Sequence, residues 1–149
     1  MAWPLHDWSG LCTATAEWTA PQTAVTAFAD TSVLIDYLRG HALAAKVLEN
    51  HRAAGPLHAS EITRLEILAG MRPGEESPTR SLLSALIWHP VDTAVAEQAG
   101  ALGRQWLPSH HTIDSADLAI AATVQLTGLA LLTKNVRHFP MFPRLRPPY

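Results

Sequence analysis

Short apolar runs that alternate with longer helical patterns limit the folds open to this chain more than any other feature. The runs at residues 25–29, 57–59 and 129–132 are apolar and are too short to be buried helices. Strands that alternate with helices are typical of a parallel sheet with helices on both of its faces. In such sheets, sites form where the strands end. We therefore predict an α/β fold with its site at the carboxyl ends of these strands.

Helical periodicity, together with the turn residues that interrupt it, predicts the intervening helices. They are expected over residues 32–38, 42–53, 60–70, 79–87, 92–106 and 115–126. A loop rich in Pro, Gly and Glu is expected at residues 72–77, and a short apolar run surrounds Trp88 and Val91. The tail after Phe139 is rich in Pro, and one edge strand is expected near Leu145.

Composition divides the chain into an N-terminal extension and one domain. Three of the five tryptophans lie in residues 1–24, among Thr, Ala, Pro and Gly and without a helical or strand period. We expect an irregular extension over residues 1–24 and a single compact domain over residues 25–149. The chain has 149 residues, of which 48% are hydrophobic and 16% charged, which is enough apolar material for one core.

Charge and composition argue against several classes of protein. The formal net charge is −2, so the chain has no basic excess that would bind nucleic acid through bulk electrostatics. No stretch approaches the ~20 apolar residues of a membrane helix, and the start lacks the pattern of a signal peptide. Cys12 is the single cysteine, which excludes an internal disulfide. We therefore expect a cytoplasmic protein without a membrane association.

Three carboxylates stand beside the predicted apolar segments. Asp30 directly follows the first predicted strand, and Glu66 lies beside the apolar stripe of the helix expected at residues 60–70. Asp117 heads the buried face of the helix expected at residues 115–126. Burial of a carboxylate is unfavourable unless it meets a partner or a cation. Because Mg²⁺ prefers oxygen ligands, metal-assisted phosphodiester hydrolysis is the leading hypothesis.

Each carboxylate also has an ordinary structural role open to it. Asp30 can cap the helix that follows, although the two hydroxyl residues after it can do so equally well. Glu66 can form a surface ion pair with an Arg, and Asp117 can form a capping box with Asp114. The eight histidines have no spacing typical of zinc ligands, and no Ser or Cys lies in a nucleophile-elbow context.

Four short motifs follow one another along the chain. They are Asp30-Thr31-Ser32, Glu66-Ile67-Leu68-Ala69-Gly70, Asp117-Leu118-Ala119-Ile120-Ala121-Ala122 and Thr133-Lys134-Asn135-Val136-Arg137-His138-Phe139. In order, spacing and context, they resemble the successive motifs of PIN domains, and most closely those of the VapC toxins of bacterial toxin–antitoxin pairs. The resemblance covers about residues 25–145. It implies a PIN-like fold, a three-layer α/β/α sandwich with a mostly parallel sheet.

The resemblance also implies a function. It implies an Mg²⁺- or Mn²⁺-dependent endoribonuclease, the toxin of a type II toxin–antitoxin pair, which is inhibited by a cognate antitoxin and forms a homodimer. The implied site comprises Asp30, Glu66 and Asp117 as catalytic residues and metal ligands, with Ser32, Thr133 and Asn135 in support. The family often has a further acid in the last motif, where this chain has Asn135 and His138. Without a cation, such clustered carboxylates should repel one another, and the pKa of at least one should rise.

Two further sets of residues, one apolar and one basic, are candidates for contacts with a partner or with RNA. Apolar residues of the first two predicted helices belong either to the core or to a groove that receives a helix of the antitoxin. These are Val33, Leu34, Tyr37, Leu38, Leu43 and Val47. Basic residues that can contact RNA phosphates are Arg39, Lys46, Arg64, Lys134 and Arg137.

Two other functions compete with the endoribonuclease. A phosphatase with an aspartyl nucleophile needs a second Asp two residues after the first, where this chain has Ser32. A PIN-like scaffold that binds protein or RNA partners without cleaving them is the stronger alternative, and the missing fourth acid favours it. The three remaining carboxylates argue against the scaffold, because a purely structural domain gains nothing from their convergence.

Overall fold

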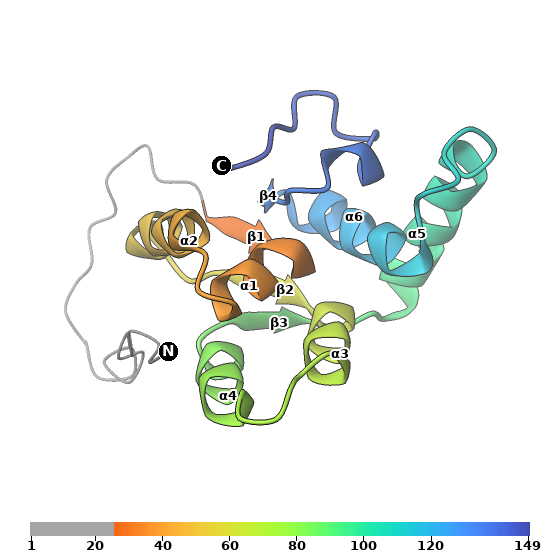
Figure 1. Cartoon of the computed structure of the whole chain (residues 1–149). Coiled ribbons are helices and arrows are strands. Elements are labelled where there is room, and N and C mark those ends of the chain that lie inside the picture. The colour runs from red at the N-terminus through yellow and green to blue at the C-terminus, as the bar shows by residue number, and fades with distance from the viewer. Residues whose placement is uncertain (1–25) are drawn as a thin grey trace.

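A parallel sheet forms the centre of the computed structural model, which describes residues 26–149 (Figure 1). Within these residues the sheet has four strands, in the order β3-β2-β1-β4. The strands are β1 (Ala27–Ala29), β2 (His58–Ser60), β3 (Ile87–His89) and β4 (Ala130–Leu132). All of their pairings are parallel. The prediction of an α/β fold is therefore confirmed, and the predicted extension over residues 1–24 lies outside the described residues.

Helices cover both faces of this sheet, as predicted (Figure 1). They are α1 (Thr31–Leu38), α2 (Ala42–Ala54), α3 (Glu61–Ala69), α4 (Glu76–Ser84), α5 (Thr93–Trp106), α6 (Ser115–Thr127) and the short 3-10 helix η2 (Val136–His138). None of the helices that the structure describes is long and apolar enough to cross a membrane.

Alternation along β1 divides the interior into two cores. Ala27 and Ala29 point into a cluster with the buried residues of α1, α2 and α4. Phe28 points the other way, into a cluster with α5, α6 and Phe139. Successive side chains of a strand point to opposite faces of its sheet. The sheet is therefore the middle layer of a three-layer α/β/α sandwich.

The pairing of β1 with β4 brings distant parts of the sequence to one edge of the sheet. Ala29 lies opposite Leu132 in this pairing, and the backbone N–H of Asp30 donates to the carbonyl of Leu132 at 2.9 Å. Because the strands are parallel, their carboxyl ends share this edge. Asp30 and Thr133, which are 103 positions apart, therefore meet there.

The fourth helix and the strand after it differ from the prediction. Helix α4 begins at Glu76 rather than Thr79, and it ends at Ser84 rather than Ile87. The predicted helix starts after Pro78, but Pro78 lies in the first turn of α4, where no backbone N–H is needed. Residues 87–89 form the edge strand β3. The prediction ended a helix at Ile87, because a short apolar run fits a helix end and a strand equally well.

The predicted edge strand near Leu145 is wrong. The tail instead turns back on itself, with N–H bonds from Phe142 to the carbonyl of Phe139 and from Leu145 to that of Phe142, each at 3.0 Å. These turns place Phe142 and Leu145 against the core that contains Phe139. Apolar side chains in the tail therefore serve packing against α6 rather than strand pairing.

Phe139 should be a main anchor of the segment after β4, because its side chain is fully buried in the core of α5 and α6. We predict that Phe139→Ala lowers the free energy of unfolding by about 3–5 kcal/mol, the usual effect of removing a buried Phe. Urea denaturation would measure this change. Phe142→Ala is the matched control and should lower the free energy of unfolding by about 1 kcal/mol, because Phe142 is only half-buried. Equal losses in the two variants would contradict the anchoring role.

Candidate active site

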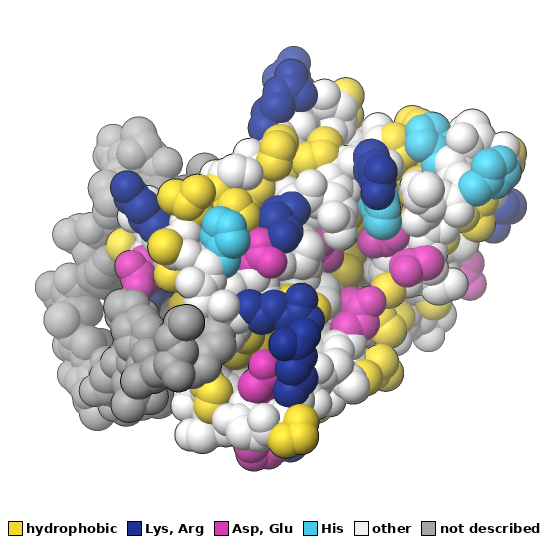
Figure 2. All heavy atoms as spheres, viewed as in Figure 1, with side chains coloured by type: hydrophobic (Ala, Val, Ile, Leu, Met, Phe, Trp, Pro, Cys, Tyr) yellow, Lys and Arg dark blue, Asp and Glu magenta, His cyan; other side chains and the backbone are white. Residues whose placement is uncertain are grey.

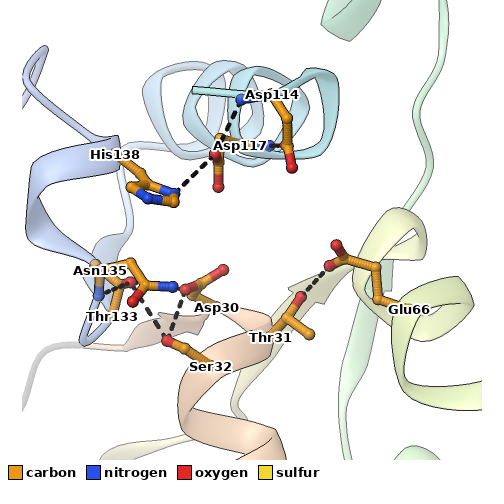
Figure 3. Close-up of polar contacts among 9 residues, drawn as sticks. All are labelled: Asp30, Thr31, Ser32, Glu66, Asp114, Asp117, Thr133, Asn135 and His138. Carbon is orange, nitrogen blue, oxygen red and sulfur yellow. Dashed lines mark hydrogen bonds and ion pairs between the residues drawn. The ribbon is translucent and has the colours of Figure 1, made fainter. Parts of the chain in front are cut away.

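Four carboxylates from three parts of the chain face one gap at the carboxyl edge of the sheet (Figure 3). Asp30 follows β1, Glu66 lies on α3, and Asp114 and Asp117 lie at the start of α6. The structure thus brings together the three acids that the sequence singled out, and it adds Asp114 to them. The segment after β4 closes the same gap from the remaining side.

Asp30 is held by hydroxyl groups and does not cap helix α1. It occupies the position before the helix, but its side chain makes no capping hydrogen bond. Its Oδ2 accepts hydrogen bonds from Ser32 Oγ at 2.8 Å and from Thr133 Oγ1 at 2.7 Å. The side chain is only 4% exposed, and that of Thr133 is fully buried. The alternative role of Asp30 as a helix cap is therefore wrong, and its carboxylate is fixed toward the gap.

Backbone groups after β4 complete this hydroxyl network. The N–H of Lys134 donates to Ser32 Oγ at 3.2 Å, and the N–H of Asn135 donates to Thr133 Oγ1 at 3.0 Å. The loop thereby orients both hydroxyls that hold Asp30. Asn135 contributes through its backbone, and its exposed side chain makes no hydrogen bond to another described residue.

Glu66 is bound by a hydroxyl of α1 and not by an Arg. Thr31 Oγ1 lies 2.5 Å from Glu66 Oε2 and 3.0 Å from the hydroxyl of Thr63. The neighbouring Arg64 instead pairs with Glu61 at 2.7 Å. The predicted alternative, a surface ion pair of Glu66, is therefore wrong.

Burial and neighbouring charge raise the pKa of Glu66. Burial is the largest cause, and the negative charges of Asp30 and Asp114 act in the same direction. The hydrogen bond from Thr31 opposes them by stabilising the ionised form. The repulsion that the sequence predicted between the clustered carboxylates is thus present in the structure.

Asp117 belongs both to a capping box and to the gap. Its backbone N–H donates to Asp114 Oδ1 at 2.9 Å, and its own Oδ2 accepts from the backbone N–H of Asp114 at 3.1 Å. The predicted capping box is therefore confirmed. The same Oδ2 lies 3.0 Å from Nδ1 of His138. The two roles are compatible, because a carboxylate oxygen accepts more than one hydrogen bond.

The pKa of Asp117 is raised to about 6. Burial is the main cause, and the charges of Asp114 and Asp30 add to it. The backbone N–H of Asp114 and the imidazole of His138 act in the opposite direction. A carboxylate with this pKa responds strongly to any positive charge placed in the gap.

For three site residues, the sequence indicated only part of the role that they have in the structure. The sequence predicted Thr31 and Asp114 as capping residues, and it placed His138 in the motif in which the family often has a further acid. A sequence signal exists for Thr63, because it lies one turn before Glu66 on the same face of α3. No sequence signal exists for the contact of His138 with Asp117, which spans 21 positions and depends on the tertiary fold.

The donors in the gap suit a hydrated, hard cation. They are carboxylate and hydroxyl oxygens, which Mg²⁺ and Mn²⁺ prefer, and no thiol is among them. Within residues 26–149, no group of three or more His, Cys, Asp or Glu side chains is placed so that it could hold a metal ion directly. Mg²⁺ does not require three direct protein ligands, because it keeps several waters and is usually bound by one or two carboxylates. The residues therefore fit a cation whose remaining ligands are waters.

Comparison with known proteins places this chain in a family. The model of the PIN domain matches residues 27–144. Ribonuclease VapC19 of Mycobacterium tuberculosis is 44% identical over 121 residues, which cover 80% of this chain and 97% of that protein. Ribonuclease VapC10 of the same organism is 39% identical over 120 residues, which cover 80% of this chain and 90% of that protein.

Solved structures show the same fold. A toxin–antitoxin complex from Klebsiella pneumoniae superposes with a TM-score of 0.70 at 32% identity, over 83% of this chain and 98% of that chain. VapBC2 from Rickettsia felis, bound to a DNA fragment from its promoter, superposes with a TM-score of 0.66 at 22% identity, over 80% of this chain and 95% of that chain. The second likeness supports the fold alone. On the family match and on the identity to the two ribonucleases, the chain belongs to the PIN domain family.

Proposed function

We propose that the chain is an endoribonuclease that hydrolyses RNA phosphodiester bonds with a metal-activated water and acts in the cytoplasm as the toxin of a toxin–antitoxin pair. The observation that carries the proposal is the meeting of Asp30, Glu66 and Asp117 around one gap (Figure 3). The names of the two ribonuclease relatives support the reaction, and the Klebsiella complex supports the toxin role. The proposed cofactor is Mg²⁺ or Mn²⁺.

In this proposal Asp30, Glu66 and Asp117 hold the cation, one or two of them directly and the rest through its bound waters. When bound, such a cation supplies a more acidic water and stabilises negative charge on the phosphate. The protein contributes orientation, because every one of these carboxylates is fixed by hydrogen bonds from neighbouring residues. It also contributes charge, because burial and the repulsion between neighbouring carboxylates raise the pKa values of Glu66 and Asp117, and a cation would offset both effects.

Basic side chains near the gap suit the phosphates that flank the cleaved bond. Lys and Arg side chains lie beside acidic side chains on the face seen in Figure 2. Of the predicted contacts, Arg137 is exposed and follows the loop that touches Asp30. Arg64 is engaged with Glu61 and lies over the ring of Trp88, 4.2 Å from its centroid. We therefore propose Arg137 as the first phosphate contact.

The proposed antitoxin contacts a shallow groove between α1 and the segment from α3 to α4. Its lining residues are Ile35, Leu38, Arg39, Ile67, Gly70, Met71, Glu75 and Thr79. Of the apolar residues predicted for a partner groove, Val33 and Leu34 are fully buried and belong to the core. Leu38 lines the groove itself. A homodimer also remains a proposal, which rests on the family resemblance.

The scaffold alternative keeps one observation in its favour. The family often has a further acid in the last motif, where this chain has Asn135 and His138, so the gap has fewer negative charges for a cation. A scaffold has no need to bind Mn²⁺ at the gap, whereas the proposed nuclease does. Titration calorimetry with Mn²⁺ therefore separates the two functions.

Removal of one carboxylate should abolish cleavage. We predict that Asp117→Asn lowers the rate of cleavage of total cellular RNA by at least about 100-fold, because the variant retains shape but not charge. Glu97→Gln is a matched control that neutralises an exposed acid of α5, and it should cleave as the unmodified chain does. EDTA should stop cleavage. Unchanged cleavage by Asp117→Asn, or cleavage that persists in EDTA, would contradict the proposed reaction.

Binding of Mn²⁺ should weaken as the pH falls through the pKa of Asp117, which is about 6. At pH 5 about nine-tenths of a group with that pKa is protonated, so the dissociation constant should rise about tenfold between pH 7 and pH 5. Calorimetric titrations at the two pH values would measure this change. In Asp117→Asn the affinity should be weaker and the dependence on pH smaller. An affinity of the unmodified chain that is the same at both pH values would refute this assignment.

A further inference from the structure

His138 makes a contact with Asp117 that neither the capping box nor the cation requires. Its Nδ1 lies 3.0 Å from Oδ2 of Asp117, and the side chain of His138 is 21% exposed. Oδ2 also accepts the backbone N–H of Asp114 at 3.1 Å. Two N–H groups thus occupy Oδ2, whereas Oδ1 has no hydrogen-bond partner among the described residues. The carboxylate is held by one oxygen and presents the other.

Backbone hydrogen bonds and the burial of the next residue hold the segment that carries His138. The N–H of His138 donates to the carbonyl of Asn135 at 2.8 Å within η2, and the next residue, Phe139, is fully buried. The same loop begins at Thr133, which donates to Asp30 at 2.7 Å. One short segment therefore contacts two of the three carboxylates, with a hydroxyl at its start and an imidazole at its end.

The chemistry of this contact differs from that of an acid at the same position. An ionised carboxylate only accepts hydrogen bonds, so Nδ1 of His138 must carry the proton. An Asp here would add negative charge beside Asp117, Asp30 and Asp114, whereas the imidazole adds a donor. His138 therefore orients Asp117 and lowers the repulsion that Asp117 experiences.

We propose that His138 is a positioning residue for Asp117. Its Nδ1–H fixes Oδ2 and leaves Oδ1 to face the cation. This inference rests on the proposed function, because it assigns the cation to the same gap. It concerns metal affinity and orientation and places no contact between His138 and the RNA.

A matched pair of substitutions tests the donor directly. The amide nitrogen of Asn is separated from the backbone by the same number of bonds as Nδ1, so His138→Asn retains a donor at that place. His138→Leu has a similar shape and no donor. We expect Mn²⁺ to bind His138→Asn within about threefold of the unmodified chain and His138→Leu about tenfold more weakly, as for other residues that orient a metal ligand. His111→Ala, in an exposed loop, should bind as the unmodified chain does.

Further readouts separate positioning from a structural role. In the metal-free protein, the ¹⁵N NMR shifts of His138 should report a protonated Nδ1. In cleavage assays, His138→Leu should lower kcat and leave KM for RNA unchanged. Equal Mn²⁺ affinity of folded Asn and Leu variants would overturn the proposal. If His138→Leu does not fold, His138→Gln replaces it, because its donor lies one bond further out and should not restore affinity.

The experiments distinguish failure of the positioning role from failure of the proposed nuclease. If Asn and Leu variants differ in Mn²⁺ affinity but no form cleaves RNA, the positioning role stands and the proposed nuclease fails. If the unmodified chain cleaves RNA and all variants bind Mn²⁺ equally, the nuclease stands and the positioning role fails.

Discussion

Repulsion among carboxylates at one edge of a parallel sheet is the constraint on which this structure depends. Parallel pairing of β1 with β4 places Asp30 at that edge, and the helices that follow the strands bring Glu66 and Asp117 to it. Burial makes the ionised forms of Glu66 and Asp117 less favourable and raises both pKa values. Among the described residues no Lys or Arg pairs with these three carboxylates, so the proposed cation would offset their charge.

Hydrogen-bond donors, rather than positive charges, hold the carboxylates in this arrangement. Two hydroxyls hold Asp30, a third holds Glu66, and two N–H groups hold Oδ2 of Asp117. Hydrogen-bond donors fix the orientation of a carboxylate and leave most of its charge available. Lysine or arginine at these places would neutralise the gap and compete with the cation. The choice of donors is therefore part of the proposed function.

The sequence predicted those features that depend on local chemistry. Apolar runs predicted β1, β2 and β4, and the spacing of Asp114 and Asp117 predicted the capping box. It failed where tertiary packing decided the outcome, at the start of α4, at β3 and in the tail near Leu145. It also missed the bond between Thr31 and Glu66, which joins residues 35 positions apart. The order of the motifs predicted which carboxylates form the site. The hydrogen-bond partners of each carboxylate depend on the tertiary fold and could not be predicted.

Paramagnetic broadening by Mn²⁺ would show directly whether a cation binds at the gap between Asp30, Glu66 and Asp117. In amide NMR spectra of the chain, substoichiometric Mn²⁺ should broaden the signals of Thr31, Glu66, Asp117 and Thr133 first. The signal of Gly128 should broaden last, because Gly128 follows Asp117 by 11 positions along α6 and lies about 16 Å from it. Selective broadening around the gap is expected if these carboxylates bind the cation. Broadening that is uniform, or centred on another part of the chain, would contradict it.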